Sequence, residues 1–237
     1  MTITPLRTPR GHLPHDRAVR EHPVREHAAR EHHAKLHSAP PLTDAPALDS
    51  PTRDMAAAER AAAAFLDALG VDLTAEGLAA TPGRMARAYA ELLTARDFEP
   101  TTFPNDEGYD ELVLARSIPI RSVCEHHLLP FMGVAHVGYL PGERILGLSK
   151  LARVVEHFAH RPQVQERLTK QVADWLEAEL APSGVGVVIE AEHLCMTLRG
   201  VQAVGSKTVT STLLGTLRSD PRSRAEFFTL VGLDGRG

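Results

Sequence analysis

The sequence predicts an α+β protein in which antiparallel strand pairs alternate with pairs of helices. Three observations support this prediction. Helical segments come first, at residues 55–69 and 81–94. The stretch from Val185 to Met196 begins with a β-branched run, and such residues favour strands. The whole order is two helices, a strand pair, two helices, a strand pair and a last helix, which is typical of α+β proteins with antiparallel hairpins.

Residues 1–54 differ in composition from the rest and are predicted to be a disordered, low-complexity tail. They hold many of the chain's 13 histidines, and the fragment Arg-Glu-His recurs from Arg20, Arg25 and Arg30. Large apolar residues are sparse, so this segment cannot bury enough apolar surface to offset the entropy lost on ordering. Because histidine-rich tracts bind metal, a metal-buffering or regulatory arm is the alternative.

Residues 55–110 are expected to form an N-terminal helical region. Its first helix covers Met55 to Leu69, and its second begins at Thr81-Pro82, where threonine can act as the N-cap and proline suits the first position. Arg84 and Arg87 lie three residues apart and therefore share one face of this second helix. Without further information, a solvated face is the simpler interpretation of these two arginines.

Residues 111–237 are expected to form the main domain. Strand-like patterns extend from Glu111 to Tyr139, and a turn follows at Pro141-Gly142. Ser149 is predicted to cap a helix that ends near His160.

A longer helix is predicted after Pro162, ending near Leu180. The clearest strand, Val185 to Met196, comes next, and Lys207 to Thr212 is expected to be another. Asp220-Pro221 then starts a final helix.

Composition and charge exclude several classes of protein. A chain of 237 residues can bury one good-sized core, and a net charge of −4 gives no reason to expect nucleic-acid binding. No apolar run is long enough to span a membrane. The arginine-rich first twenty residues do not resemble a secretory signal, so the cytoplasm is the expected location. The two cysteines are therefore expected in a metal or catalytic role rather than in a disulfide.

Two short clusters combine cysteine with histidine. In the first, Cys124 and His127 have the C-x-x-H spacing that lets a turn present both side chains to one ion. In the second, His193 and Cys195 are two residues apart on a predicted strand and should therefore point to the same face. That face continues back through alternate residues to Val185, from the predicted apolar core to the site.

The donor set favours an open, catalytic zinc site over a closed structural one. A catalytic site uses three protein ligands and leaves one position for water. Neighbouring His126 and His127 cannot easily both bind from an extended segment. Cys124, His127 and Cys195 are therefore predicted to bind zinc, with His126 and His193 as unligated acid/base groups. Buried cysteines and hydrogen-bonded histidines without a metal are the alternative, a poor account of two clusters that use every cysteine.

Around these residues the chain resembles GTP cyclohydrolase I of the zinc-dependent type. The resemblance covers about residues 55–235, and its central motifs are long and specific. The matching segments are SVCEHHLLPF (122–131), GLSKLARVVEHFAHRPQVQERLT (147–169), GVGVVIEAEHLCMTLRG (184–200), SKTVTST (206–212) and, more weakly, TPGRMARAY (81–89).

The resemblance implies a tunnelling fold, in which a four-stranded antiparallel sheet carries two helices and follows an N-terminal helical part. It also implies that the sheets of several subunits join into a β-barrel ring, that two pentameric rings stack as a homodecamer, and that active sites lie between subunits. The implied cofactor is Zn²⁺. The implied reaction opens the imidazole ring of GTP by hydrolysis, releases C8 as formate and recloses the product to 7,8-dihydroneopterin triphosphate. This is the first step of tetrahydrofolate and pterin biosynthesis.

The same resemblance implies roles for the site residues. The family's zinc ligands and its two acid/base histidines fall on the five residues named above. Glu166 matches the carboxylate that recognises guanine through its N1–H and 2-amino donors, and Gln165 is expected to assist through its backbone or amide. Positions that contact the triphosphate fall on Ser149, Lys150, Arg153, Arg199, Arg84 and Arg87. Of these, Arg84 matches a residue that reaches a neighbouring subunit's site, and Arg87 stands where some members have lysine.

Two other hypotheses belong beside this one. The chain could be a tunnelling-fold relative that acts on another pterin or deazapurine, although the cysteine motif of the nitrile-reducing members is not visible. It could also be a zinc-stabilised oligomeric binding module. Such a module has no need for the unligated histidines or the cationic residues.

Overall fold

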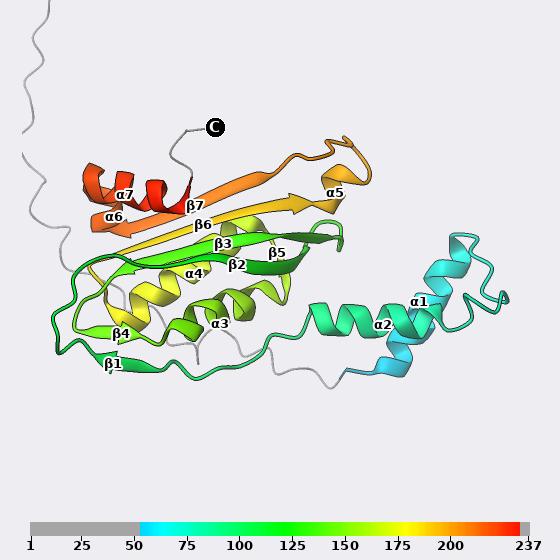
Figure 1. The fold of residues 1–237 in the computed structure, drawn as a ribbon. Helices are drawn as coiled ribbons and strands as arrows, with labels where there is room; N and C mark the ends of the chain where they lie inside the picture. The colour runs from blue at the N-terminus through cyan, green and yellow to red at the C-terminus, as the bar shows by residue number, and fades with distance from the viewer. Residues whose placement is uncertain (1–52, 233–237) are drawn as a thin grey trace, which may run out of the picture. The chain divides into compact units, whose positions relative to one another are not determined.

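The computed structural model of the chain describes residues 53–232, which are coloured in Figure 1. The predicted tail, residues 1–54, lies outside the described residues except for its last two. Of these, Asp54 is the N-cap of the first helix, because its carboxylate accepts a hydrogen bond from the backbone N–H of Ala57 at 2.8 Å.

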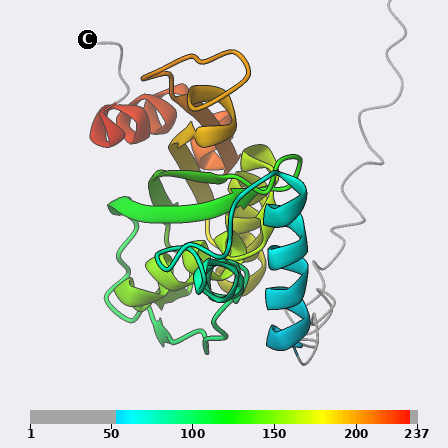
Figure 2. The ribbon, with the colours of Figure 1, turned by 90° about the vertical axis from the view of Figure 1, so that its right-hand side faces the viewer.

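Two helices, α1 (Met55–Ala68) and α2 (Thr81–Leu92), begin the fold and pack against each other (Figures 1 and 2). Arg53 joins the start of α1 to the end of α2, because its guanidinium donates to the carbonyl oxygen of Leu93 at 2.7 Å. The predicted N-cap role of Thr81 is wrong. Thr81 is already helical, and the residue before it caps the helix without a side-chain hydrogen bond.

The centre of the fold is a five-stranded sheet with the strand order β5-β2-β3-β6-β7. Neighbouring strands are antiparallel except for β5, which pairs parallel with the end of β2. The strands are β2 (Val113–Cys124), β3 (Pro130–Leu140), β5 (Pro162–Gln163), β6 (Gly184–His193) and β7 (Thr208–Gly215).

The α+β class predicted from the sequence is confirmed by this arrangement, as are its four longer antiparallel strands. A separate two-stranded sheet of β1 (Thr102–Pro104) and β4 (Arg144–Leu146), like the short β5, was not predicted. Strands of two or three residues are too short to show an alternating pattern.

One face of the sheet packs on two helices, α3 (Leu148–Ala159) and α4 (Gln165–Leu180), which Figure 1 shows side by side on the same side of the strands. The predicted alternation in β6 is confirmed, since its alternate residues all lie in this core. The core includes Val185, Val187, Ile189 and Ala191 from β6, Phe131, Ala135, Val137 and Tyr139 from β3, and Leu151, Leu168, Val172 and Leu176 from the helices. The ends of β2 and β6 therefore lie at the same end of the sheet, on either side of β3.

The opposite face is covered at one end by α6 (Thr216–Ser219) and α7 (Pro221–Val231). Phe227 of α7 is fully buried there. A Cβ at Gly186 would lie only 2.7 Å from its ring, so glycine in β6 makes room for this aromatic side chain.

Two further predictions are corrected. The strand predicted from Val185 to Met196 ends at His193, where a one-turn helix, α5 (Leu194–Thr197), begins. Ser149 does not cap α3, because the helix already begins at Leu148 and no side chain caps it. Among residues 53–232, no helix combines the length and apolar character that crossing a membrane requires.

Candidate active site

The first cysteine–histidine cluster forms where β2 ends and the chain reverses into β3. The backbone N–H of Leu128 donates to the carbonyl oxygen of Cys124 at 2.8 Å, and Leu128 has a positive φ of 52°. This tight turn brings both neighbouring imidazoles back towards the cysteine. The Nδ1 atoms of His126 and His127 lie 3.9 and 3.8 Å from the Cys124 sulfur.

The second cluster meets the first through α5. The sulfurs of Cys124 and Cys195 and one ring nitrogen of His127 all lie within 4.8 Å of one another. The structure therefore brings together the three side chains predicted as ligands. The prediction that His193 and Cys195 lie on one strand was wrong, however, because His193 is the last residue of β6 and Cys195 lies in the helical turn after it.

The electrostatics of this cluster suit a divalent cation. Burial raises the pKa of the Cys195 thiol, and the adjacent Cys124 raises it further, while Arg199 acts in the opposite direction. A divalent metal ion would favour the thiolate form of Cys195, because its positive charge offsets the cost of placing a thiolate in this buried position. Two sulfurs and one imidazole nitrogen are donors that zinc prefers, and a set of three leaves a fourth position open. The residues present therefore fit zinc.

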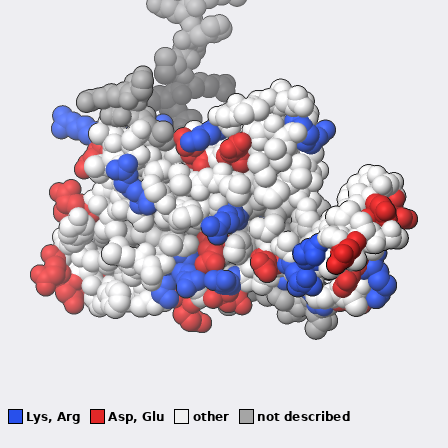
Figure 3. Space-filling view, turned by 45° about the vertical axis from the view of Figure 1, so that its right-hand side comes forward, with Lys and Arg blue, Asp and Glu red and all other residues white. Residues whose placement is uncertain are grey.

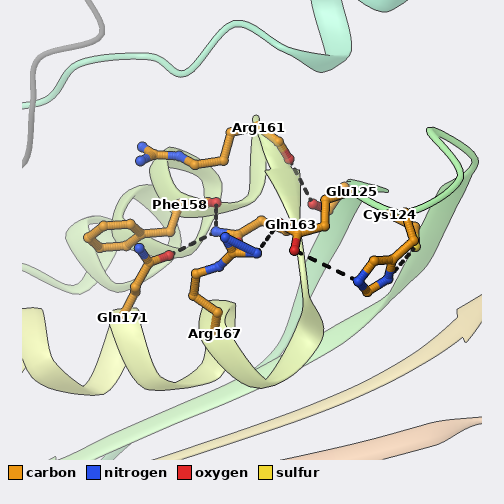
Figure 4. Close-up of polar contacts among 9 residues, drawn as sticks. Cys124, Glu125, Phe158, Arg161, Gln163, Arg167 and Gln171 are labelled. Carbon is orange, nitrogen blue, oxygen red and sulfur yellow. Dashed lines mark hydrogen bonds and ion pairs between the residues drawn. The ribbon is translucent and has the colours of Figure 1, made fainter.

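His126 is exposed and lies beside Glu125, which pairs with Arg167, and sequence reasoning selected neither of these two charged residues. Its Nε2 is 3.8 Å from the carboxylate of Glu125, which also forms an ion pair with Arg167 of α4, as Figure 4 shows for the two labelled residues. Glu125 stands inside the CEHH motif, but its partner is 42 residues away, and no local pattern signals that contact.

His193 is held on two sides by the protein. Its ring stacks on Phe131 of the paired strand β3, with centroids 4.5 Å apart and planes 10° apart. Its Nε2 lies 2.7 Å from Oε1 of Gln165. Burial lowers the pKa of His193, and the nearby carboxylate of Glu166 acts in the opposite direction.

The two residues at the start of α4 have different environments. Glu166 is exposed in the first turn of the helix, where its carboxylate is available to a ligand. Gln165 is buried, and both ends of its side-chain amide are bonded within the protein. Its side chain is therefore not free for substrate, and only its backbone could take part in binding.

The cationic residues are not gathered at the cysteine cluster within this chain. Ser149, Lys150 and Arg153 lie in the first half of α3, whereas Cys124 pairs with the short strand that follows the other end of that helix (Figure 1). A rise of about 1.5 Å per residue puts Lys150 roughly 13 Å along the helix from Ala159. Arg153 also forms an ion pair with Glu156 at 3.0 Å.

The remaining predicted cations are exposed. Arg199 follows α5 and is close enough to influence Cys195. Arg84 donates to the Thr81 hydroxyl (2.7 Å) and the Gly77 carbonyl (3.0 Å), at the start of its own helix, and Arg87 is exposed on that helix. On the face shown in Figure 3, Lys and Arg are mixed with Asp and Glu, so any anion site there must be local.

The helical region nevertheless touches the turn between β2 and β3. The phenol hydroxyl of Tyr89 on α2 donates to the carbonyl oxygen of Leu128 at 3.1 Å. The turn that carries Cys124 and His127 is thus supported from outside the sheet.

An α+β fold with a Cys–His–Cys cluster, flanked by two imidazoles outside that cluster, defines a class of enzyme with an open metal site and acid/base groups around it. The sequence profile of the family described as GTP cyclohydrolase I matches residues 58–232. The chain belongs to the GTP cyclohydrolase I family. This membership confirms the family predicted from the sequence, and with it a hydrolase of pterin and folate biosynthesis.

Individual relatives agree with this assignment. The chain is 54% identical over 167 residues to GTP cyclohydrolase 1 of Aquifex aeolicus, covering 70% of this chain and 91% of the relative. It is 53% identical over 171 residues to the proteins of the same name from Corynebacterium glutamicum and Thermoanaerobacter pseudethanolicus, covering 70% of this chain and 87% and 90% of theirs. A solved structure, an archaeosine synthase QueF-Like in the apo form, is 19% identical with a TM-score of 0.36, covering 44% of this chain and 93% of that one. At this identity and TM-score, the similarity says nothing about the function of the chain.

Proposed function

We propose that the chain is a zinc-dependent GTP cyclohydrolase I, which converts GTP and water to 7,8-dihydroneopterin triphosphate and formate. One observation carries the mechanism beyond family membership. Three metal donors, Cys124, His127 and Cys195, converge within 4.8 Å, and two other histidines, His126 and His193, lie in the same two segments without belonging to that set.

Zinc is the proposed cofactor, held by these three side chains. Bound with one open position, zinc supplies a nucleophile at neutral pH because it makes water far more acidic. The chain's own contribution is to aim the three donors at one point. The turn after β2 and the helical turn after β6 do this from the same end of the sheet, on either side of β3.

His126 and His193 are proposed to move protons. Protonation of the imidazole ring of guanine beside C8 makes that carbon more electrophilic, and an imidazole titrates in the range where it can both give and take a proton. General acid–base help of this kind is worth roughly 10²–10⁴-fold in rate. His126 has the carboxylate of Glu125 beside it at 3.8 Å, whereas the side chains that hold His193 are the uncharged Gln165 and Phe131.

Glu166 is proposed to recognise guanine. Its carboxylate can accept two parallel hydrogen bonds from the N1–H and 2-amino groups, a donor pair that adenine lacks. The first backbone N–H groups of α4, at Gln165 and Glu166, have no partner within the helix and can donate to the guanine carbonyl. This gives Gln165 a binding role through its backbone.

The triphosphate is proposed to bind the cationic and polar set. Forked guanidinium donors suit phosphate oxygens, and the start of a helix favours anions. The proposed residues are Ser149, Lys150, Arg153, Arg199, Arg84 and Arg87. Because the α3 members lie far along that helix from Cys124, one chain does not form the complete site, and we propose that active sites lie between subunits.

The proposed assembly is a homodecamer whose sheets join into β-barrels. Two features support contacts between copies. Within residues 53–232, β7 is the outermost strand at one edge of the sheet and has no strand beyond it. At the other edge, most of β2 is unpaired, because the short β5 pairs only with its end. A cavity of about 970 Å³ lies along that open edge, lined by Ile118 to Arg121 and by parts of α2 and α3. Unpaired edges of this kind readily pair with another chain.

We also propose a division into a dispensable tail (1–54), a helical region (55–110) and the catalytic domain (111–237). Removal of residues 1–50 should leave activity and zinc content intact. A truncated protein that loses its single core-bound zinc would contradict this division.

The experiment that tests the proposed function incubates the protein with GTP, with and without a chelator. A pterin chromophore should appear in the ultraviolet spectrum together with formate, and the chelator should abolish both until zinc is restored. If neither product forms at equimolar zinc, the proposal is refuted. Light scattering near the monomer mass of 25.8 kDa would refute the shared site.

A further inference from the structure

The buried side chain of Gln165 makes an unusually complete set of hydrogen bonds. Its amide stands at the first residue of α4, between the ends of β6 and β7. Its Nε2 lies 3.1 Å from the Ile189 carbonyl oxygen, 3.0 Å from the Thr208 carbonyl oxygen and 3.1 Å from the Thr210 hydroxyl, and its Oε1 lies 2.7 Å from His193 Nε2.

These contacts allow only one orientation of the amide. The carbonyl oxygens of Ile189 and Thr208 can only accept hydrogen bonds, so the amide NH₂ must face them. A flipped amide would place its oxygen against two other oxygens and leave its NH₂ facing His193. Oε1 of Gln165 therefore faces the histidine.

The donor and acceptor roles of two nearby threonine hydroxyls agree with this orientation of the amide. The Thr169 hydroxyl donates to the backbone carbonyl of Gln165 at 2.8 Å, which uses its single hydrogen. In the contact of 2.6 Å between Thr169 and Thr210, the Thr210 hydroxyl must then be the donor. Its lone pairs remain free to accept from Gln165 Nε2, whose two hydrogens are shared among three acceptors.

The orientation of the Gln165 amide determines which ring nitrogen of His193 carries a hydrogen. Oε1 of Gln165 carries no hydrogen, so the hydrogen in the 2.7 Å contact belongs to His193 Nε2. A neutral imidazole has one N–H, and the other nitrogen, Nδ1, therefore holds the lone pair. Stacking on Phe131 fixes the plane of the ring, and a turn of the ring by 180° within that plane would replace Nε2 by a carbon and lose the hydrogen bond to Gln165.

We propose that Gln165 is a positioning residue for the reaction. It holds His193 in the Nε2–H form, so that the lone pair of the ring is on Nδ1 and Nδ1 is the ring nitrogen left for the reacting groups. This inference rests on the proposed function, in which His193 is an acid/base group. It differs from a substrate-binding role for the Gln165 amide, because it predicts an effect on turnover without an effect on GTP binding.

The test compares Gln165→Met with Gln163→Met. Methionine fills a similar volume but offers His193 no strong acceptor. Gln163 is a matched control, because it is also buried and its amide donates to the Phe158 carbonyl and Gln171 Oε1, each at 2.8 Å, and not to the histidine (Figure 4). We expect kcat to fall about 10²-fold in Gln165→Met. Zinc content and the Kd for GTP, measured by equilibrium binding, should be unchanged, and Gln163→Met should keep its turnover.

Gln165→Glu is the rescue variant. A protonated glutamic acid can donate to one of the two carbonyls and still present an oxygen to His193, so its kcat should recover well above that of Gln165→Met. The inference is overturned if Gln165→Met keeps the wild-type kcat, if it loses GTP binding in parallel with kcat, if Gln163→Met falls equally, or if Gln165→Glu is no better than Gln165→Met.

A second measurement needs no variant, in case Gln165→Met does not fold. Neutron diffraction from deuterated crystals of the whole protein should show deuterium on Nε2 of His193, directed at Gln165. Deuterium on Nδ1 alone would overturn the inference. Failure of the proposed function is a separate outcome, since it would appear as wild-type protein that forms no pterin and no formate from GTP.

Discussion

At Gly133 of β3 the backbone approaches Glu190 of β6 so closely that a Cβ would lie 1.9 Å from the Glu190 carbonyl oxygen and 2.6 Å from the Cα of Ala191. These are backbone atoms in the middle of a strand pair, so they cannot move aside as a flexible side chain would. Two residues further along the same pair, Phe131 lies opposite His193. The close approach therefore sets the spacing of the strands that position a predicted catalytic histidine.

We expect Gly133→Ala to destabilise the protein by about 1–3 kcal/mol or more, because the added methyl group forces the two strands apart. Chemical denaturation measures this change. Gly77→Ala is the matched control, since a Cβ at Gly77 has no atom within 4 Å. Equal stability of the two variants would contradict the steric argument.

Cys195→Ala and His193→Ala are expected to separate zinc binding from turnover. Removal of the Cys195 sulfur takes away one of three converging donors, so zinc content should fall towards zero. Removal of His193, which is bonded to Gln165 and stacked on Phe131, should leave zinc bound but abolish turnover. Metal analysis of the purified variants measures the difference, and equal zinc loss in both would show that the ligand assignment is wrong.

Glu166→Ala is expected to weaken GTP binding while zinc stays bound. Hydrogen bonds to a charged group contribute about 1.5–3 kcal/mol, which corresponds to a rise in Kd of roughly 10- to 150-fold. Glu177→Ala, an exposed glutamate near the other end of the same helix, is the control. Calorimetric titration with GTP that gives the same Kd for both variants would rule out guanine recognition by Glu166.

His136 of β3 is expected to make stability depend on pH. It is buried, and among the described residues its Nδ1 has no hydrogen-bond partner. Burial lowers its pKa below 6.5, Arg116 lowers it further, and Glu190 acts in the opposite direction. Between the folded and unfolded pKa values the unfolded chain binds more protons. Stability is therefore full above pH 6.5 and is lost as the pH falls below it.

The measurement is the pH dependence of unfolding for wild type and His136→Leu, both in excess chelator so that metal loss does not contribute. One proton limits the slope to about 1.4 kcal/mol per pH unit. Below pH 6.5 the variant should show the shallower slope. Identical slopes would mean that His136 is not the group responsible.

Several features were predictable because they depend on local sequence. The alternation from Val185 to Ala191 predicted which residues of β6 share the face that packs in the core with α3 and α4, and the C-x-x-H spacing predicted that Cys124 and His127 converge. The exact path to Cys195 was not predictable. A β-branched run gives no sign of the residue at which the strand turns into α5, because the end of a strand depends on its neighbours.

The sequence by itself determined the family, the α+β class and the candidate set of metal donors, since these depend on residue identity, spacing and hydrophobic period. Only the tertiary structure decided that Gln165 is buried against His193, that Glu125 pairs with Arg167, and that Lys150 lies far along α3 from Cys124. Each of these facts depends on how elements distant in the chain pack together. Packing of this kind depends on the folded backbone as a whole, so no hydrophobic period or local spacing in the sequence indicates it.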